Sequence, residues 1–248
     1  MTLEQFFTKN PEVAVAFSGG VDSAYLLYAA KRYAARVKAY YVSTAFQPAF
    51  EREDARRLAD EVGADMQVLH VDVLMSGAVV ANPSDRCYHC KNTLFRQILR
   101  AAENDGFPVL LDGTNASDDA GDRPGMRALR GLSFRSPLRE CGLTKAEIRR
   151  LSKAAGLFTW DKPAYACLAT RIRTGEEITL QKLKQTEKAE GFLFGLGFRD
   201  FRVRMVGNTA KLELREADLP LLLENREKIV TELRKDYDSV LLNLEVRK

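Results

Sequence analysis

The sequence contains no long run of apolar residues. No stretch of about 18 consecutive apolar positions occurs, so we expect no transmembrane helix. The first seven residues lack the basic and apolar segments of a signal peptide. Cysteine is also scarce: four cysteines in 248 residues are too few for the disulfide framework of a small secreted protein. These absences together predict a cytoplasmic protein.

An excess of charge of one sign is lacking as well. The chain has 38 basic and 34 acidic side chains, which gives a net charge of +4. This balance is too even for an extensive nucleic-acid-binding surface, so we expect neither nucleic acid nor a membrane as a partner. Apolar residues make up 46% of the chain and charged residues 29%, which is typical of a globular protein with a sizeable core. The length allows one large domain or two.

Apolar, β-branched runs alternate with amphipathic segments along the first two thirds of the chain. This alternation predicts right-handed βαβ units, and therefore an α/β fold with a doubly wound parallel sheet. His70 is expected to point into the core of this sheet, and we assign it no chemical role. The predicted strands are residues 13–17, 37–42, 66–71 and 108–112, and the predicted helices are residues 2–9, 24–33, 49–62, 92–103 and 144–156.

The pattern changes after about residue 179. The sequence now predicts a helix, two strands joined at Gly207 and Asn208, a second helix and a last strand. These elements form a smaller C-terminal α+β domain, to which we assign substrate binding or subunit contacts in a homo-oligomer. The predicted domains are residues 1–175 and 176–248, with helices at 180–193 and 217–233 and a last strand at 240–246.

A short glycine-containing turn follows the first predicted strand and precedes the first long helix. A strand, a tight turn and a helix N-terminus form a common phosphate-binding geometry, because glycine lets backbone N–H groups approach an anion closely. Asp22 or Ser23 can cap the following helix. A Gly-Gly pair alone is more typical of an ordinary turn, but the whole string favours phosphate binding. Its residues are Ser18, Gly19, Gly20, Val21, Asp22 and Ser23.

This string resembles the pyrophosphate loop of the N-type ATP pyrophosphatases, a group that includes the GMP, NAD and argininosuccinate synthetases and the tRNA thiolases. It is not a Walker A loop, because no Gly-Lys-Ser/Thr follows. The resemblance implies that ATP is cleaved between its α- and β-phosphates and that a substrate oxygen is activated as an adenylate. The loop does not identify the acceptor.

Three of the four cysteines lie in polar segments. Cys87 and Cys90 form a C-x-x-C pair, and Cys167 lies in a distant loop. The pair alone is compatible with a redox site, half a zinc site or two inert thiols, and three thiolates would suit an iron–sulfur cluster. A four-thiolate zinc site would also need Cys141, which we expect to pack instead. His89, inside the motif, could serve as a ligand but is more typical of a solvent-facing residue.

Further charged residues are candidates for ligand binding. Asp118, Asp119 and Asp122 lie in a loop that follows a predicted strand, where they could bind Mg²⁺ or form a solvated turn. Glu190 lies on the apolar face of a predicted helix, a position that requires an arginine or a metal nearby. Guanidinium groups pair bidentately with anions, so four arginines could bind an anionic substrate. They are Arg171, Arg173, Arg202 and Arg204, of which Arg202 and Arg204 share one face of a strand.

Across almost the whole chain, these motifs together resemble the LarE family of ATP-dependent sulfur transferases, which act in the synthesis of the nickel-pincer nucleotide. The resemblance rests on the pyrophosphate loop, the run at residues 82–91 and the loop ending at Arg171, among other segments. It implies that ATP and Mg²⁺ serve to adenylate a carboxylate of pyridinium-3,5-biscarboxylic acid mononucleotide, which sulfur then converts to a thiocarboxylate. Implied ATP contacts include Gly113 and Arg123, and implied substrate contacts are Arg171, Glu190, Arg202 and Arg204.

The family has two sulfur sources. In one subtype a cysteine of the loop gives up its own sulfur, and that position falls on Ala166, next to Cys167. In the other subtype three cysteines hold a [4Fe-4S] cluster whose open iron carries sulfide. Cys87, Cys90 and Cys167 resemble the second pattern, which we favour, with sulfide or a sulfur donor as partner. A sacrificial role for Cys167 stays open.

Three other functions are compared with this interpretation. A tRNA thiolase would also combine a pyrophosphate loop with three cysteines, but such enzymes carry a lysine where Val21 stands and an added RNA-binding module. A non-catalytic ATP-binding regulator would not turn ATP over to AMP. A synthetase of the NAD or GMP type uses ammonia and does not need three cysteines.

Overall fold

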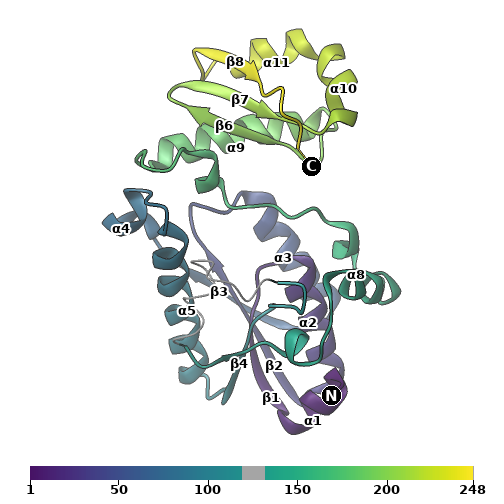
Figure 1. Cartoon of the computed structure of the whole chain (residues 1–248). Coiled ribbons are helices and arrows are strands. Elements are labelled where there is room, and N and C mark those ends of the chain that lie inside the picture. Colours follow the sequence, from purple (N-terminus) through teal and green to yellow (C-terminus); the bar gives the residue numbers. More distant parts are fainter. Residues whose placement is uncertain (119–131, 248) are drawn as a thin grey trace. The chain divides into compact units, whose positions relative to one another are not determined.

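The computed structural model describes residues 1–118 and 132–247. The chain divides into two compact units (Figure 1). The N-terminal unit comprises Met1–Val73 and Asp85–Ala164, and the C-terminal unit comprises Leu74–Ser84 and Tyr165–Lys248. The division at residues 175/176 stays a prediction. No helix in the described part of the chain is long and apolar enough to span a membrane.

The N-terminal unit is built on a five-stranded parallel sheet. Its strand order is β3-β2-β1-β4-β5, and every pairing is parallel. The chain begins at the central strand β1, continues outward through β2 and β3, and then crosses to β4 and β5 on the other side of β1. This order agrees with the predicted doubly wound parallel sheet. The strands are β1 (Glu12–Ala16), β2 (Arg36–Ser43), β3 (Asp65–His70), β4 (Val109–Leu111) and β5 (Phe134–Arg135).

Helices cover both faces of this sheet. Helices α2 (Val21–Tyr33) and α3 (Ala49–Glu61) bury Leu26, Leu27 and Leu58 against one face, while α5 (Arg86–Asn104) buries Ile98 and Ala102 against the other (Figure 1). Because β1 is central, its alternate side chains enter both cores, Val13 and Val15 on one side and Ala14 on the other. The other α-helices that the structure describes in this unit are α1 (Leu3–Lys9), α7 (Pro137–Glu140) and α8 (Lys145–Ala154).

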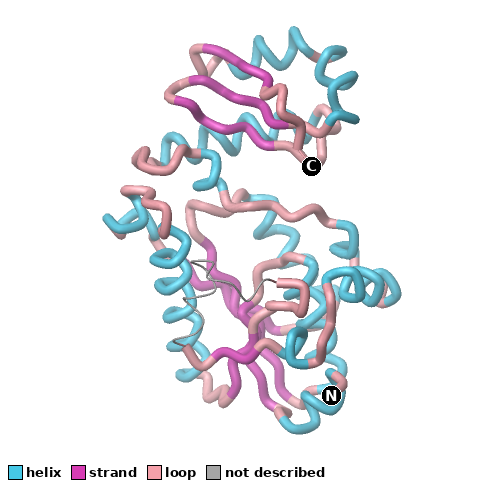
Figure 2. Tube along the Cα trace, in the orientation of Figure 1, coloured by secondary structure: helices cyan, strands magenta, loops and turns pink. Residues whose placement is uncertain are grey.

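The C-terminal unit is a three-stranded sheet with helices. Strand β6 (Arg202–Val206) pairs antiparallel with β7 (Thr209–Glu213) across the Gly207–Asn208 turn, and β7 pairs parallel with β8 (Ser239–Leu242) (Figure 2). Its long helix, α9 (Leu180–Gly195), has Thr179 as N-cap. The helices α4 (Gly77–Val80), α10 (Leu219–Glu224) and α11 (Arg226–Leu233) complete the unit. This confirms the prediction of a separate, smaller C-terminal sheet with helices.

Three sequence-based expectations are wrong in detail. The helix predicted at 92–103 begins six residues earlier, at Arg86. The single helix predicted at 217–233 is interrupted at Asn225, whose Nδ2 donates to the Leu221 carbonyl at 3.1 Å. His70 is exposed instead of buried, because it is the last residue of β3, an edge strand.

Candidate active site

The glycine turn after β1 is the central feature of the N-terminal unit. Gly19 has a φ of +74°, and a Cβ atom there would lie 3.1 Å from the Ala55 Cβ of α3. Gly20 is the N-cap of α2 and no side chain caps this helix, so its first-turn N–H groups are not used by a capping side chain. A positive φ and a close backbone approach both require glycine here. The turn thus has the form of an anion cradle.

Ser23 fixes the shape of this turn. Its Oγ accepts a hydrogen bond from the Ser18 backbone N–H at 3.2 Å and donates to the Gly20 carbonyl at 3.1 Å. Because Gly20 is the N-cap, Asp22 and Ser23 lie inside the helix, and the expected capping role of either residue is wrong. Ser23 instead links the two ends of the loop.

Asp22 is the acidic residue of the loop. Its Oδ2 lies 2.6 Å from Nζ of Lys145, at the start of α8. Its Oδ1 is buried and has no hydrogen-bond partner among the described residues. A buried carboxylate oxygen without a partner is costly, so this atom is suited to a ligand that supplies a positive charge.

The segment after β4 lies against the same loop. A Cβ atom on Gly113 would lie 3.0 Å from the backbone nitrogen of Ser23, so only glycine fits there. Asp112 is buried and rigidly held: Oδ1 accepts from the Thr114 N–H at 2.7 Å and Oδ2 from the Ser136 hydroxyl at 2.9 Å. Asp118 Oδ2 accepts from the Asn115 N–H at 2.9 Å. The expected partners Asp119, Asp122 and Arg123 lie outside the described residues.

A charge cluster at the start of α3 was not predicted from the sequence. Nζ of Lys162 lies 2.7 Å from Asp54 Oδ2 and 3.2 Å from Glu51 Oε1. Burial raises the pKa of Glu51 in spite of the opposing effect of Lys162. Burial also raises the pKa of Tyr41 to about 12, with Glu51 contributing. Lys162 is more than a hundred positions from Glu51 and Asp54 in the sequence, so no local sequence pattern signals their contact.

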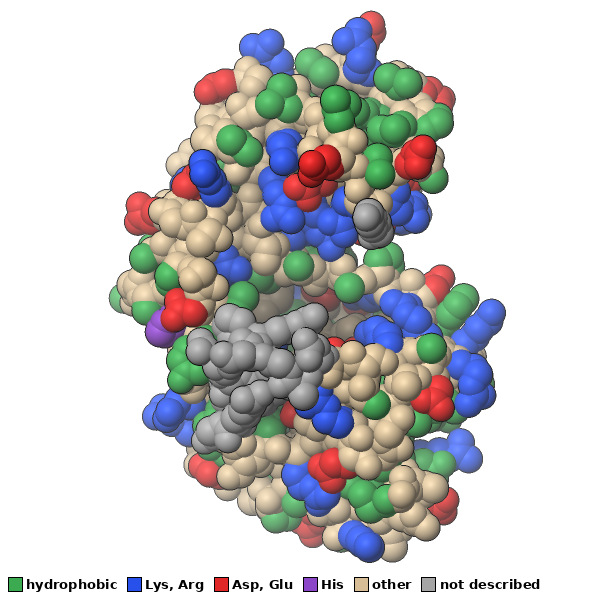
Figure 3. All heavy atoms as spheres, in the orientation of Figure 1, with side chains coloured by type: hydrophobic (Ala, Val, Ile, Leu, Met, Phe, Trp, Pro, Cys, Tyr) green, Lys and Arg blue, Asp and Glu red, His purple; other side chains and the backbone are tan. Residues whose placement is uncertain are grey.

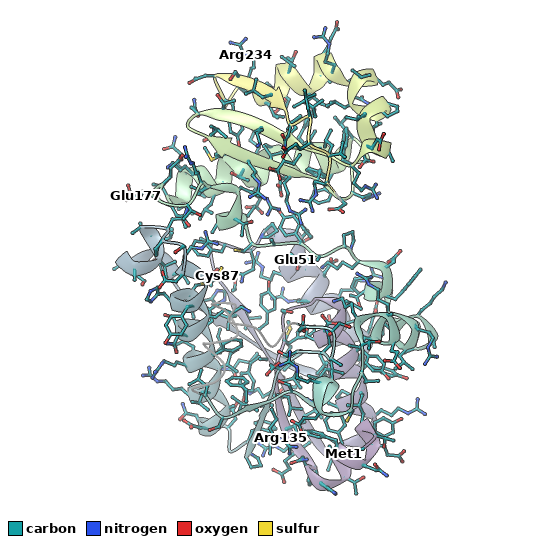
Figure 4. All side chains as sticks on the ribbon, viewed as in Figure 1. Met1, Glu51, Cys87, Arg135, Glu177 and Arg234 are labelled. Atoms are coloured by element: carbon teal, nitrogen blue, oxygen red, sulfur yellow. The ribbon has the colours of Figure 1, made fainter. Side chains whose placement is uncertain are left out.

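The C-x-x-C pair lies within the first two turns of α5 instead of before the helix. Asp85 is the N-cap residue of this helix, and Cys87 and Cys90 are one turn apart, so both lie on one side of it. Cys87 is exposed and lies at the start of α5, and Cys90 is half-buried (Figure 4). Nη2 of Arg86 lies 3.7 Å from Cys87 Sγ. A helix N-terminus and a guanidinium both make the surroundings of this sulfur electropositive.

His89 and Cys141, the other two candidate ligands of the sequence analysis, each contact the protein itself. His89 Nε2 lies 3.3 Å from Asp85 Oδ2 on the same helix face. Cys141 packs against the core of the N-terminal unit, as expected, and burial raises the pKa of its thiol. No cysteine forms a disulfide. Among residues 1–118 and 132–247, no cluster of three or more His, Cys, Asp or Glu side chains has an arrangement suited to a metal.

Cys167 lies in a tightly braced segment of the C-terminal unit. It precedes a short 3₁₀ turn, Leu168–Arg171. Arg171 is 1% exposed and its guanidinium is held by Glu190: Nε to Oε1 at 2.7 Å and Nη2 to Oε2 at 3.0 Å. Its Nη1 donates to the Ala166 carbonyl at 3.1 Å and the Thr170 hydroxyl at 2.8 Å. Arg171 therefore ties the residues on both sides of Cys167 to α9.

Glu190 completes this buried network. It is 1% exposed, accepts the Tyr165 hydroxyl and accepts the Val203 N–H at 2.9 Å. Burial, reinforced by Glu190, raises the pKa of Tyr165. The expectation that Glu190 must contact an arginine or a metal agrees with its pairing to Arg171. The network links the cysteine segment, α9 and β6.

The two arginines of β6 differ in exposure. Arg202 is 6% exposed, Nη1 donates to the Phe201 carbonyl at 2.5 Å, and burial lowers the pKa of its guanidinium. The side chain of Arg204 is 40% exposed, with Nε 2.7 Å from Glu213 Oε1 and Nη1 donating to the Thr170 carbonyl at 2.6 Å. Lys and Arg side chains gather on the drawn face of the C-terminal unit (Figure 3). Arg204 is thus the more accessible of the two for an anion.

Comparison with known proteins agrees with this geometry. The asparagine synthase family model matches residues 5–116, which include the pyrophosphate loop. The pyridinium-3,5-bisthiocarboxylic acid mononucleotide synthase of Lactiplantibacillus plantarum is 32% identical over 224 residues, 90% of this chain and 81% of its own. The chain belongs to the LarE family of ATP-dependent sulfurtransferases. The predicted family is thereby confirmed.

Two further relatives of this chain are uncharacterised proteins. One from Synechocystis is 37% identical over 215 residues, which cover 86% of this chain and 80% of the relative. One from Methanocaldococcus jannaschii is 30% identical over 240 residues, which cover 96% and 91%. Because each match covers 86% or more of this chain, all three extend into both units.

Proposed function

We propose that this LarE-family protein uses ATP to adenylate a carboxylate of pyridinium-3,5-biscarboxylic acid mononucleotide and converts it to a thiocarboxylate, a step of nickel-pincer nucleotide synthesis. The observation that carries the proposal is the identity of 32%, over 90% of this chain, with a synthase named for the bisthiocarboxylic acid product. The glycine cradle formed by Gly19 and Gly113 supports the use of ATP.

ATP would bind with its phosphates against the turn between β1 and α2. The first-turn N–H groups of α2 supply hydrogen bonds and a positive dipole end. Gly19 and Gly113 allow the chain to pack closely around the turn, because a Cβ atom on Gly19 would meet Ala55 and one on Gly113 would meet Ser23. The residues proposed to contact ATP are Ser18, Gly19, Gly20, Val21, Asp22, Ser23, Gly113 and Arg123.

Mg²⁺ fits the oxygen atoms near this loop. The buried Oδ1 of Asp22, without a partner in the described part of the chain, provides an oxygen donor of the kind Mg²⁺ prefers. We propose Asp118 and Asp119 as further ligands, directly or through water. Bound Mg²⁺ would neutralise charge on the phosphates, while the chain's own N–H groups orient them.

The reaction has two bond exchanges. A carboxylate oxygen of the acceptor attacks the α-phosphorus, and the P–O bond to the leaving pyrophosphate breaks. Sulfide then attacks the activated carboxyl carbon, and the C–O bond to AMP breaks with its electron pair remaining on AMP. Negative charge develops on phosphate oxygens in the first step, where preorganised backbone N–H groups lower the barrier. Cleavage to AMP is therefore the diagnostic feature.

The acceptor carries a phosphate and two carboxylates, which require cationic partners. The partly exposed guanidinium of Arg204 is our first candidate, with Arg202 beside it on the same face of β6. We assign Arg171 and Glu190 to the acceptor side of the site as well. Because they bind each other, their contribution is to hold the cysteine segment and β6 in position.

The sulfur source is proposed to depend on Cys87, Cys90 and Cys167. Three thiols are the ligand type that a [4Fe-4S] cluster requires, and two of them lie in the first two turns of α5, with the Arg86 guanidinium next to Cys87. When bound, the cluster would supply an open iron position for sulfide. The alternative is that Cys167 donates its own sulfur, which needs no iron.

An anaerobic assay with ATP, Mg²⁺, sulfide and the dicarboxylate mononucleotide tests the proposal. We expect AMP, pyrophosphate and a product in which oxygen is replaced by sulfur, identified by mass spectrometry. Nicotinamide mononucleotide, which has no carboxylate, is the matched control acceptor and should give no AMP. Formation of ADP and phosphate, or thiolation of tRNA in place of the mononucleotide, would show the assignment to be wrong.

A further inference from the structure

Asn82 has an unusual backbone conformation within the C-terminal unit. Among the described residues it is the only non-glycine residue with a positive φ, at 53°. It follows α4, and its N–H donates to the Val79 carbonyl at 3.1 Å, so it ends the helix in the left-handed conformation that asparagine tolerates. Yet its side chain is not on the surface, because the residue is 1% exposed.

The buried Asn82 side chain joins two distant segments. Its Nδ2 donates to the Arg173 carbonyl at 2.8 Å and to the Ile172 carbonyl at 3.4 Å. The backbone continues the contact: Gly175 N–H donates to the Asn82 carbonyl and Ile178 N–H to the Val80 carbonyl, each at 2.9 Å. Residues 80–82 are thus fastened along residues 172–178, and all of these residues belong to one compact unit.

Both fastened segments lead directly to cysteines. Asn82 precedes Cys87 by five positions, and Ile172 follows Cys167 by five positions. A chain of five residues spans at most about 18 Å, so each of these cysteines is tethered within that reach of the contact whatever conformation the connecting residues take. Arg171, adjacent to the contact, further braces the Cys167 segment through Glu190.

We propose that Asn82 is a positioning residue for sulfur delivery: it clamps residues 80–82, which lead toward Cys87, onto residues 172–178, which follow Cys167. The inference rests on the proposed function. The clamp lies within the C-terminal unit, whereas the phosphate loop belongs to the N-terminal unit. Its effect is therefore on the sulfur-transfer half of the reaction and not on adenylation.

The chemistry of the clamp explains why asparagine is suited to this position. Glycine would keep the positive φ but lose both side-chain hydrogen bonds. Aspartate would keep the shape and tolerate the conformation, but its oxygens would face the two carbonyl oxygens with no proton to donate. Asn82→Asp therefore removes the clamp with little change in volume, and Asn82→Gly separates backbone conformation from hydrogen bonding.

The test compares these variants with Asn225→Asp. Asn225 is a matched control in the same unit, because its Nδ2 also donates to a backbone carbonyl, that of Leu221, at 3.1 Å. Each protein is assayed anaerobically for AMP and for thiocarboxylate, and the ratio of the two products is the readout. A general loss of folding lowers both products together, whereas loss of the clamp lowers only the ratio.

We expect Asn82→Asp to form AMP within about twofold of the wild-type rate but to lower thiocarboxylate per AMP by about tenfold or more, since misplaced reacting groups cost 10²-fold for about 1 Å. Asn82→Gly should be intermediate and Asn225→Asp unchanged. An unchanged product ratio in Asn82→Asp, or a parallel fall of both products, would overturn the proposal.

A second readout does not depend on activity. Amide hydrogen exchange should show faster exchange at Gly175 and Ile178 in Asn82→Asp, and wild-type rates at these positions in Asn225→Asp. If the wild-type protein forms no thiocarboxylate, the proposed function fails, and exchange still decides whether the clamp exists. If Gly175 and Ile178 exchange at the wild-type rate in Asn82→Asp, the proposed clamp is wrong.

Discussion

Gly113 lies directly against Ser23. A Cβ atom on Gly113 would be 3.0 Å from the Ser23 nitrogen and 3.3 Å from its Cα. The two residues follow β4 and β1, which are neighbours in the sheet, so the contact joins the carboxyl ends of adjacent parallel strands. In open α/β sheets ligands bind at this edge, at the point where the strand order reverses.

Replacing Gly113 by alanine should impair ATP cleavage. The new methyl group meets backbone atoms of α2 that cannot move independently, so the loop and the helix N-terminus must separate. We expect AMP formation to fall by roughly 100-fold, the typical cost of a displacement of about 1 Å. Gly191→Ala, at an exposed helical position with open space around it, is the control. A Gly113→Ala enzyme with wild-type AMP formation would contradict the proposed ATP site.

The buried pair of Arg171 and Glu190 should be important for the stability of the C-terminal unit. Both residues are 1% exposed, so Glu190→Ala leaves a buried guanidinium without its partner. Breaking such a pair costs about 3–5 kcal/mol. Denaturant unfolding of Glu190→Ala should show a loss of this size, and Arg171→Leu combined with Glu190→Ala should be less destabilised than the sum of the single variants. Additive losses would argue against a direct pair.

Much of the N-terminal unit follows from local sequence patterns. The β-branched runs that form β1 to β3 alternate with amphipathic helices, and this alternation was enough to predict a parallel sheet. Thr144 and Glu147 form a capping box at the start of α8, and the predicted helix began at this position. The glycines of the pyrophosphate loop identified the turn itself, because its backbone conformation requires them.

Long-range contacts could not be predicted in the same way. Lys162 meets Glu51 and Asp54 over more than a hundred positions, and no periodicity signals such a pairing. The start of α5 was predicted too late because Cys87 and Tyr88 are weak helix formers, while the helix is stabilised by packing of its later turns. Arg171 was expected to bind an anion, but in the structure its guanidinium is paired with Glu190.

Glu51 should make stability depend on pH. Burial raises its pKa in the folded state, so between the unfolded value of about 4.3 and the higher folded value the folded state binds more protons. Its contribution to stability is therefore present below pH ~4.3 and is lost as pH rises through the folded pKa. Denaturant unfolding of wild type and Glu51→Gln between acidic and neutral pH should show the wild type losing stability relative to the variant as pH rises.

A matched variant controls for the loss of a charge on α3. Glu53 lies on the same helix but is exposed, so Glu53→Gln removes one carboxylate and leaves both carboxylates that contact Lys162 in place. A difference between wild type and Glu51→Gln that stays constant across this pH range would contradict the assigned burial effect.

Arg204 should bind the acceptor and not ATP. Its side chain is partly exposed on β6, while the ATP loop belongs to the N-terminal unit. Arg204→Ala should weaken acceptor binding by about 1.5–3 kcal/mol, the usual value for a charged hydrogen bond, and leave ATP binding unchanged. Isothermal titration with each ligand measures both affinities. Arg234→Ala, at an exposed position of the same unit, is the control (Figure 4). Equal losses for both ligands would indicate a folding defect.

The cysteines decide between the two sulfur sources. A three-thiolate cluster needs each of Cys87, Cys90 and Cys167, because two ligands hold a cubane poorly. A sacrificial cysteine needs only Cys167 and is indifferent to the pair on α5. Alanine variants of all three should therefore lose iron and multiple turnover together under the cluster hypothesis. Cys141→Ala is the control, since Cys141 packs against the core of the N-terminal unit.

The measurement combines iron content, visible absorbance and intact mass after turnover. Under the cluster hypothesis the wild-type protein keeps its mass after many turnovers, because external sulfide replaces the sulfur that is transferred. Under the sacrificial hypothesis its mass falls by that of one H₂S after a single turnover, because the thiol becomes an alkene. Full activity of Cys87→Ala and Cys90→Ala together with that mass loss would exclude the cluster.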